Sequence, residues 1–161
     1  MEFVERDGKM VLMDFDPSEA LMLAMYVEAE GARFYRELSR RTKQKHIVNE
    51  LQFLLKEEES HSKTFKDLLV SMGGGVPEIP DEDVVASLTG VFGPIRKLRT
   101  EDILCDNAEA LRLGATVKKR MISFFQSLLE QTNNSGARRV LEDIIKQEER
   151  HLGKLKLLLA Y

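Results

Sequence analysis

Two short motifs in the chain place a carboxylate three residues before an imidazole: Glu58-x-x-His61 and Glu148-x-x-His151. On a helix, residues three positions apart project from the same face, so the Glu and the His of each motif can bind one metal ion. Imidazole ligands favour iron, manganese or zinc over magnesium or calcium. The motifs therefore predict a metal site for one or two ions, with iron as the first choice and manganese or zinc as alternatives.

The two motifs lie 90 residues apart, and the same separation relates much of the chain to itself. Asp16-x-x-Glu19, a pattern typical of helix N-termini, recurs as Asp106-x-x-Glu109. Further matched pairs are Leu21 with Leu111, Val27 with Val117, Phe34 with Phe124, Leu51 with Leu141, Lys56 with Lys146 and Leu68 with Leu158. Because one register holds over two helices and the turn between them, we predict a duplicated helical hairpin.

The spacing of apolar residues predicts four helices, at about 17–41, 44–71, 107–132 and 135–160. The turn within each pair is short, which forces the two helices of a hairpin to run antiparallel. We divide the chain into hairpin 1 (about 16–71), a crossover (about 72–105) with a short helix near 83–88, and hairpin 2 (about 106–161). A long crossover lets the second and third helices lie parallel. The prediction is one all-α domain, a ferritin-like four-helix bundle.

Each predicted helix carries polar residues on its apolar stripe. These inward positions are Glu28 on the first helix, Glu58 and His61 on the second, Lys118 on the third, and Glu148 and His151 on the fourth. A buried carboxylate that is not neutralised loses several kcal/mol of hydration. A divalent cation between the helices would neutralise these carboxylates, which supports the metal site.

Lys118 stands where the 90-residue register predicts a counterpart of Glu28. Three glutamates carry −3, and Lys118 with one divalent ion carries +3, so a one-ion site is neutral. Two divalent ions would leave +2 and require hydroxide, oxide or another anion. We therefore favour a first position made by Glu28, Glu58 and His61 with Glu148 bridging. A second position would be made by Glu148 and His151, with Glu58 as an optional third ligand.

These residues resemble the rubrerythrin-like branch of the ferritin superfamily over nearly the whole chain. The resemblance rests on EALMLAMYVEAEGARFY, EEESH and QEERH, and more weakly on EALRLGATVKKRMISFF. It implies that the metal ligands are Glu28, Glu58, His61, Glu148 and His151. Two glutamates of the family pattern would fall at Lys118 and Met121 and are missing. The single cysteine cannot form the iron site of the family's rubredoxin module.

The resemblance implies non-haem iron chemistry, in which peroxide or dioxygen is reduced while ferrous iron is oxidised. The partners would be that small oxidant and an unidentified electron donor, and the protein would be a homodimer. Lys118 can act as a proton donor or as a fixed positive charge beside the bound oxidant. Tyr35, two turns from Glu28 on the same helix face, can hydrogen-bond a ligand.

Composition narrows the other possibilities. Lys and Arg number 24 against 27 Asp and Glu, and the two signs are mixed, which argues against a nucleic-acid or membrane partner. Cys105 is the only cysteine, so an intrachain disulfide is excluded and a cytoplasmic location is expected. The charged N-terminal residues before the apolar run 10–13 are unlike a signal peptide.

Two other functions are compatible with the sequence. In the first, the bundle is a non-enzymatic scaffold or an iron-handling protein with a degenerate site, and Lys118 with protonated histidines balances the carboxylates. In the second, the protein forms an iron-storage or DNA-protecting shell, although it has no basic tail for DNA. Metal analysis separates the first from an enzyme, and sedimentation detects the second.

Overall fold

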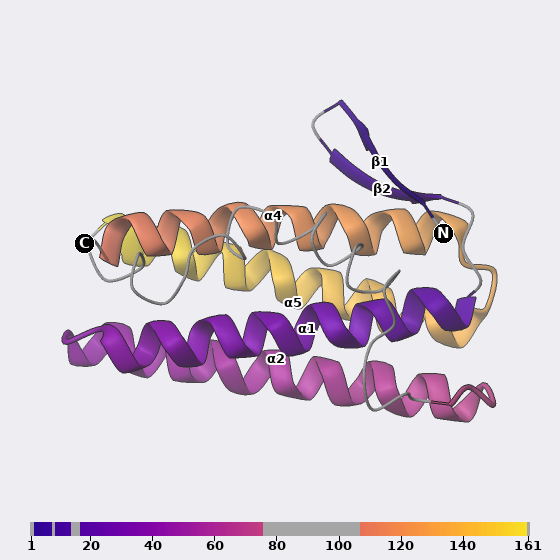
Figure 1. Ribbon diagram of the computed structural model, residues 1–161, viewed down its shortest axis with the longest axis horizontal. Coiled ribbons are helices and arrows are strands. Elements are labelled where there is room, and N and C mark those ends of the chain that lie inside the picture. Colours follow the sequence, from indigo (N-terminus) through magenta and orange to yellow (C-terminus); the bar gives the residue numbers. More distant parts are fainter. Residues whose placement is uncertain (1, 8, 14–16, 76–106, 161) are drawn as a thin grey trace.

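The computed structural model describes residues 2–7, 9–13, 17–75 and 107–160 of the 161-residue chain. It contains four long helices: α1 (Pro17–Arg41), α2 (Lys45–Ser71), α4 (Asn107–Gln131) and α5 (Ser135–Ala160). They lie side by side along the long axis of the molecule (Figure 1). The predicted all-α four-helix bundle is confirmed, and each predicted helix boundary is within one residue of the observed one.

The helix ends follow from local hydrogen bonding. The Asn134 side chain accepts the backbone N–H of Ala137 at 2.9 Å, which satisfies a free donor at the start of α5. Arg138 donates to the carbonyl oxygens of Leu129 and Thr132 at the end of α4. Gly73 ends α2, because its φ of 80° is unfavourable for residues with a Cβ.

The two hairpins, α1–α2 and α4–α5, pack against each other through α1 with α4 and α2 with α5. Following the sequence colours in Figure 1, α2 and α4 run in the same direction and both oppose α1 and α5. The rings of Phe65 and Phe125, from α2 and α4, meet across the core with centroids 5.4 Å apart. The parallel second and third helices expected of a bundle with one crossover are therefore observed.

The core is a continuous set of aliphatic and aromatic side chains contributed by all four helices. Leu23, Leu51, Leu54, Phe124 and Leu155 are among those with no exposed surface. At mid-length this apolar core is interrupted by the polar residues described in the next subsection. Burying them is tolerated only if their charges are compensated locally.

A short antiparallel β-hairpin precedes the bundle and was not predicted. It pairs β1 (Glu2–Arg6) with β2 (Lys9–Met13), and β2 contacts α4. The sequence does carry a signal for it, because Asp7-Gly8 is a favoured two-residue hairpin turn. Asp7 has a φ of 53°, as such a turn requires. The apolar run 10–13 is thus the β2 strand.

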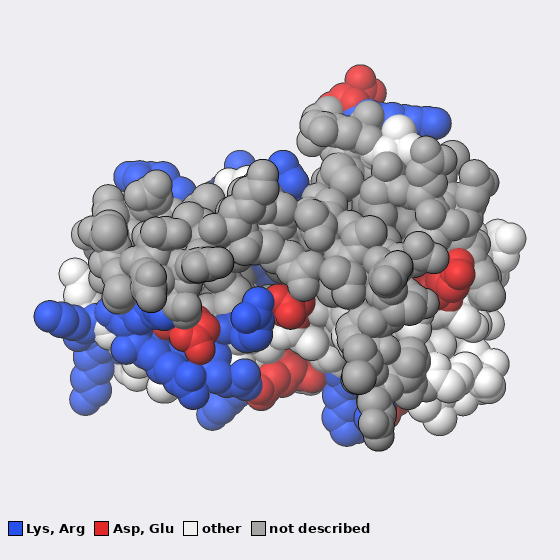
Figure 2. All heavy atoms as spheres, viewed as in Figure 1, with Lys and Arg blue, Asp and Glu red and all other residues white. Residues whose placement is uncertain are grey.

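Some predictions fall outside the described residues: the helix near 83–88, Cys105, and the N-cap residues Asp16 and Asp106. None of the described helices has a stretch apolar enough to cross a membrane. In Figure 2 the described surface carries both charge signs, with Lys and Arg most numerous near the end of the bundle where α1 is followed by α2. Acidic side chains lie among them, as in the Arg36–Glu59 and Arg40–Glu37 ion pairs.

Candidate metal centre

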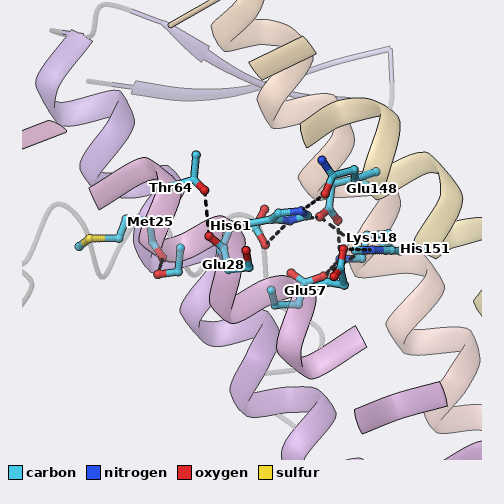
Figure 3. A network of polar contacts seen from close by, with 12 residues as sticks. Met25, Glu28, Glu57, His61, Thr64, Lys118, Glu148 and His151 are labelled. Atoms are coloured by element: carbon cyan, nitrogen blue, oxygen red, sulfur yellow. Dashed lines mark hydrogen bonds and ion pairs between the residues drawn. The ribbon is translucent and has the colours of Figure 1, made fainter. Parts of the chain in front are cut away.

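All five predicted metal ligands meet in the middle of the bundle. Glu28 comes from α1, Glu58 and His61 from α2, and Glu148 and His151 from α5; each is at most 3 % exposed. Figure 3 shows four of them, Glu28, His61, Glu148 and His151, gathered in one network together with Lys118 from α4. We call the five residues the candidate metal centre. Its side chains lie on regular helices, so their positions are fixed by the bundle rather than by loops.

The first group of ligands in the centre consists of Glu28, His61 and Glu148, whose ligand atoms lie within 4.8 Å of one another. His61 Nδ1 is 2.8 Å from Glu148 Oε1 and 3.6 Å from Glu28 Oε2. These three residues come from α1, α2 and α5. We call them the first trio, and they can surround one ion from three sides.

The second group, Glu58, Glu148 and His151, shares Glu148 with the first and meets the same 4.8 Å limit. We call it the second trio. Glu58 thus groups with His151, in the second position for which it was predicted as an optional ligand, and not with the first position to which it was primarily assigned. The reason lies in its neighbours: Glu58 Oε2 lies against Gly31 of α1, and Glu58 Oε1 is held by Lys118.

Lys118 is fully buried and lies between the two motif helices. Its Nζ forms ion pairs with Glu58 Oε1 and with Glu148 Oε2, the latter at 2.5 Å. The same Nζ is 5.4 Å from the ring centroid of Tyr35, which is also buried. Both residues singled out as possible catalytic groups therefore adjoin the second trio.

Each histidine finds a second partner on the opposite hairpin. His61 Nε2 is hydrogen-bonded to Gln147 Oε1 at 2.7 Å, and His151 Nε2 is 3.8 Å from Glu57 Oε2. As an amide oxygen can only accept, Nε2 of His61 donates and its Nδ1 is free to ligate. Gln147 and Glu57 were not predicted as site residues. Each directly precedes the glutamate of a motif, but its histidine partner depends on how α2 packs against α5.

Burial and close charges shift the pKa values in opposite directions. Burial raises the pKa of Glu28 well above its ordinary value, and Glu148 and Glu58 raise it further. Burial acts the same way on Glu148, but Lys118 and the two histidines outweigh it and hold its pKa well below the ordinary value. Burial would raise the pKa of Glu58 too, but Lys118 together with the contacts to Glu28 and His151 lowers it.

The basic groups respond to the same carboxylates. Burial alone would lower the pKa of His61, but its contacts with Glu148 and Glu28 raise it to about 11. The pKa of His151 is raised for the same reason, by Glu148 and Glu58. Lys118 also has a raised pKa, since Glu148 and Glu58 outweigh burial. Without metal, the carboxylates of Glu58 and Glu148 therefore face three basic groups that hold protons, while Glu28 favours its own protonated form.

Buried side-chain atoms that lack a hydrogen-bond partner indicate whether the candidate metal centre suits a metal ion. In the described part of the chain, eight buried side-chain atoms have no hydrogen-bond partner, and seven belong to the candidate metal centre. They are both carboxylate oxygens of Glu28 and Glu148, Glu58 Oε2, and the Nδ1 atoms of His61 and His151. Such atoms are costly to bury unless something satisfies them. Oxygen and imidazole donors suit a divalent transition metal, so the residues fit one.

A shallow depression of about 110 Å³ reaches the centre from the surface between α2 and α5. Its lining consists of Phe53, Glu57, Gln147, Arg150, His151 and Lys154. Because His151 belongs to the centre and Gln147 binds His61, this depression borders the centre on its α2–α5 side.

The comparisons with known proteins decide the family. The Rubrerythrin family model matches residues 19–159, which includes all four helices and every residue of the candidate metal centre. This chain belongs to the rubrerythrin family. No curated protein is significantly similar to it in sequence.

Two solved structures resemble this member of the rubrerythrin family. One, from Thermotoga maritima, is described as a ferritin-like diiron-carboxylate protein; it is 25 % identical, with a TM-score of 0.69, over 92 % of this chain and 97 % of that one. The other, a hypothetical protein from Pyrococcus furiosus, is 18 % identical, with a TM-score of 0.68, over 91 % and 90 % of the two chains. The second shows the fold alone.

Proposed function

We propose that this rubrerythrin-family protein binds non-haem iron at the candidate metal centre and oxidises ferrous iron with peroxide or dioxygen. The observation that carries the proposal is the convergence, in the buried interior of the bundle, of seven oxygen and nitrogen atoms that lack a hydrogen-bond partner. The family match and the two groups of carboxylate and imidazole ligands support iron as the metal. Manganese and zinc are the alternatives.

The reaction must balance electrons and protons. Bound iron would supply electrons one at a time to the oxidant. Hydrogen peroxide takes up two electrons and two protons, its O–O bond breaks, and two water molecules form. One ferrous ion gives one electron on becoming ferric, so the second comes from another ferrous ion or from an external one-electron reductant.

The chain's own residues prepare the centre for this chemistry. Gln147 fixes the ring of His61 so that Nδ1 faces Glu28 and Glu148. Lys118 places a positive charge beside Glu58 and Glu148, which favours negative charge on a nearby oxidant. Its ammonium group, which α4 holds against both carboxylates, can also donate a proton there. Tyr35 adjoins it and limits the space on that side.

Glu28→Gln tests the proposal, because it keeps the volume of the side chain and removes one ligand charge. The parent, purified without chelator and loaded anaerobically with ferrous iron, should retain iron and oxidise it when hydrogen peroxide is added. The variant should lose iron affinity at least tenfold and oxidise correspondingly less. Bound iron is measured by elemental analysis, and oxidation by optical absorbance.

Glu30→Gln is the matched control, since Glu30 lies two residues away on α1 and pairs with exposed Arg33. It should bind and oxidise iron as the parent does. A parent protein that retains no iron, or a Glu28→Gln variant that behaves like the control, would contradict the proposal.

A second function is favoured by one specific observation. Lys118 and the two histidines supply three positive groups for the three carboxylates, so the centre can be charge-balanced without metal. In that case the bundle is a scaffold or partner-binding protein. It would be purified free of metal and colourless after aerobic ferrous loading.

The homodimer, the cytoplasmic location and the external electron donor also stay predictions.

A further inference from the structure

The two trios are not equivalent, because Lys118 contacts both Glu58 and Glu148 of the second trio but only the shared Glu148 of the first. We propose that the centre binds one metal ion per chain, held by Glu28, His61 and Glu148, and that the Lys118 ammonium takes the place of a second ion. This inference rests on the proposed function, since it specifies how many ions that function uses and where.

Contacts of Lys118 supply the first argument. Its Nζ joins Glu58 and Glu148, the two carboxylates that the second trio would have to offer to a metal. An ammonium ion bound to both oxygens occupies the position from which a cation would bridge them. A divalent ion added there would lie within a few ångströms of a like charge, in an interior that screens charge poorly.

The first trio meets this competition only at the shared Glu148. Glu28 pairs with His61 rather than with Lys118, and both of its oxygens lack a hydrogen-bond partner. Glu148 divides its two oxygens: Oε1 faces His61 at 2.8 Å, while Oε2 faces Lys118. One side of Glu148 is therefore available to a metal in the first trio while the other side remains held.

Charge gives the second argument. With neutral imidazoles, the three carboxylates carry −3, the ammonium +1 and one divalent ion +2, which sum to zero. A second divalent ion would leave +2 in a site whose side chains are at most 3 % exposed. Uncompensated charge of this kind is what buried sites avoid.

His151 then becomes a carboxylate partner instead of a metal ligand. Its Nδ1 is 3.4 Å from Glu58 Oε1 and 3.6 Å from Glu148 Oε1. Its Nε2 faces Glu57. The ring also lies over that of His61, with centroids 5.6 Å apart, so it can pack beside the first trio without binding the ion.

The test counts cobalt(II) ions bound per chain, by calorimetric titration and by the visible absorbance of the bound ion. The unchanged protein should bind one. Lys118→Glu should bind two, because it removes the ammonium and adds a carboxylate. Lys119→Glu, an equal charge change at the adjacent exposed position, should still bind one.

A pair of histidine variants keeps the test decisive if Lys118→Glu does not fold, which circular dichroism would reveal. His61→Ala should lose cobalt affinity at least a hundredfold, whereas His151→Ala should still bind one ion within about tenfold of the parent affinity. Two ions in the unchanged protein, or equal losses in the two variants, would overturn the inference but leave the proposed function standing. No bound ion in the unchanged protein would overturn both.

Discussion

At the metal centre, the two hairpins present the same motif on one helix and opposite charges on the other. α2 and α5 present the same Glu-x-x-His motif, and each motif residue is buried in both. α1 and α4 instead present opposite charges, Glu28 and Lys118, at positions 90 residues apart. The charge of the metal centre can therefore be changed by substitutions on α1 or α4, while the motifs on α2 and α5 stay the same.

Two further differences between α1 and α4 accompany this one. α1 has Gly31 and Tyr35 where α4 has Met121 and Phe125. Gly31 leaves room for Glu58, because a Cβ there would lie 2.9 Å from Glu58 Oε2. Tyr35 adds a hydroxyl group on the side where Lys118 lies. The asymmetry therefore involves space as well as charge.

The largest expected effect comes from Lys118→Met, which removes the positive charge that α4 contributes but roughly keeps the side-chain volume. Glu58 and Glu148 would lose a buried partner, so the free energy of unfolding of the metal-free protein should fall by about 3–5 kcal/mol. Urea unfolding followed by circular dichroism measures it. Lys119→Met, at an exposed position, should change the value by no more than about 0.5 kcal/mol. Equal effects of the two substitutions would show that Lys118 does not stabilise the carboxylates.

A second prediction sharpens the comparison through pH. The folded pKa of His61 is about 11, above an unfolded value of about 6.5, so its protonation stabilises the metal-free fold. That stabilisation is complete below about pH 6.5 and is lost as the pH rises towards 11. One proton can contribute a slope of at most about 1.4 kcal/mol per pH unit. Unfolding free energies measured from pH 6 to 10 should therefore decrease.

His61→Gln should flatten this decrease. The pKa of His151, in the other hairpin, is also raised. The pH dependence of unfolding in His151→Gln is therefore compared with that in His61→Gln. The prediction is wrong if the parent slope persists in His61→Gln.

The smallest expected effect concerns glycines. Gly31→Ala should destabilise the protein by about 1–3 kcal/mol, because the added methyl group presses on Glu58 in a packed interior. Gly153→Ala in α5 meets nothing within 4 Å and should stabilise the helix by up to about 1 kcal/mol. Thermal unfolding of the two variants gives the signs. A stabilising Gly31→Ala would mean that Glu58 moves aside at no cost.

The fold was predictable because the helix pattern is long and regular. Ile47, Leu51 and Leu54 lead to Glu58 and His61 in steps of four and three, and all five are buried. Such a stripe identifies the inward face of a helix wherever the neighbouring helices lie. The β-hairpin was missed because its strands are only five residues long, and a short apolar run does not distinguish a strand from a helix.

The centre was predictable as a set of residues but not as a set of contacts. That Glu58 would pair with Lys118 depends on how α4 is placed beside α2, which no spacing within one helix encodes. The roles of Gln147 and Glu57 depend likewise on the packing of α2 against α5. The spacing of apolar residues predicts which face of a helix is buried. Which side-chain atoms come into contact depends on how the helices pack against each other.

The exchange of histidine partners between hairpins has a consequence for assembly. His61 of one hairpin is oriented by Gln147 of the other, and His151 faces Glu57 across the same interface. Neither hairpin by itself can hold its own imidazole in the binding orientation. During folding, the two imidazole rings can therefore reach the metal-binding orientation only after the hairpins have packed together. A fluctuation that separates the hairpins would release both rings at the same time.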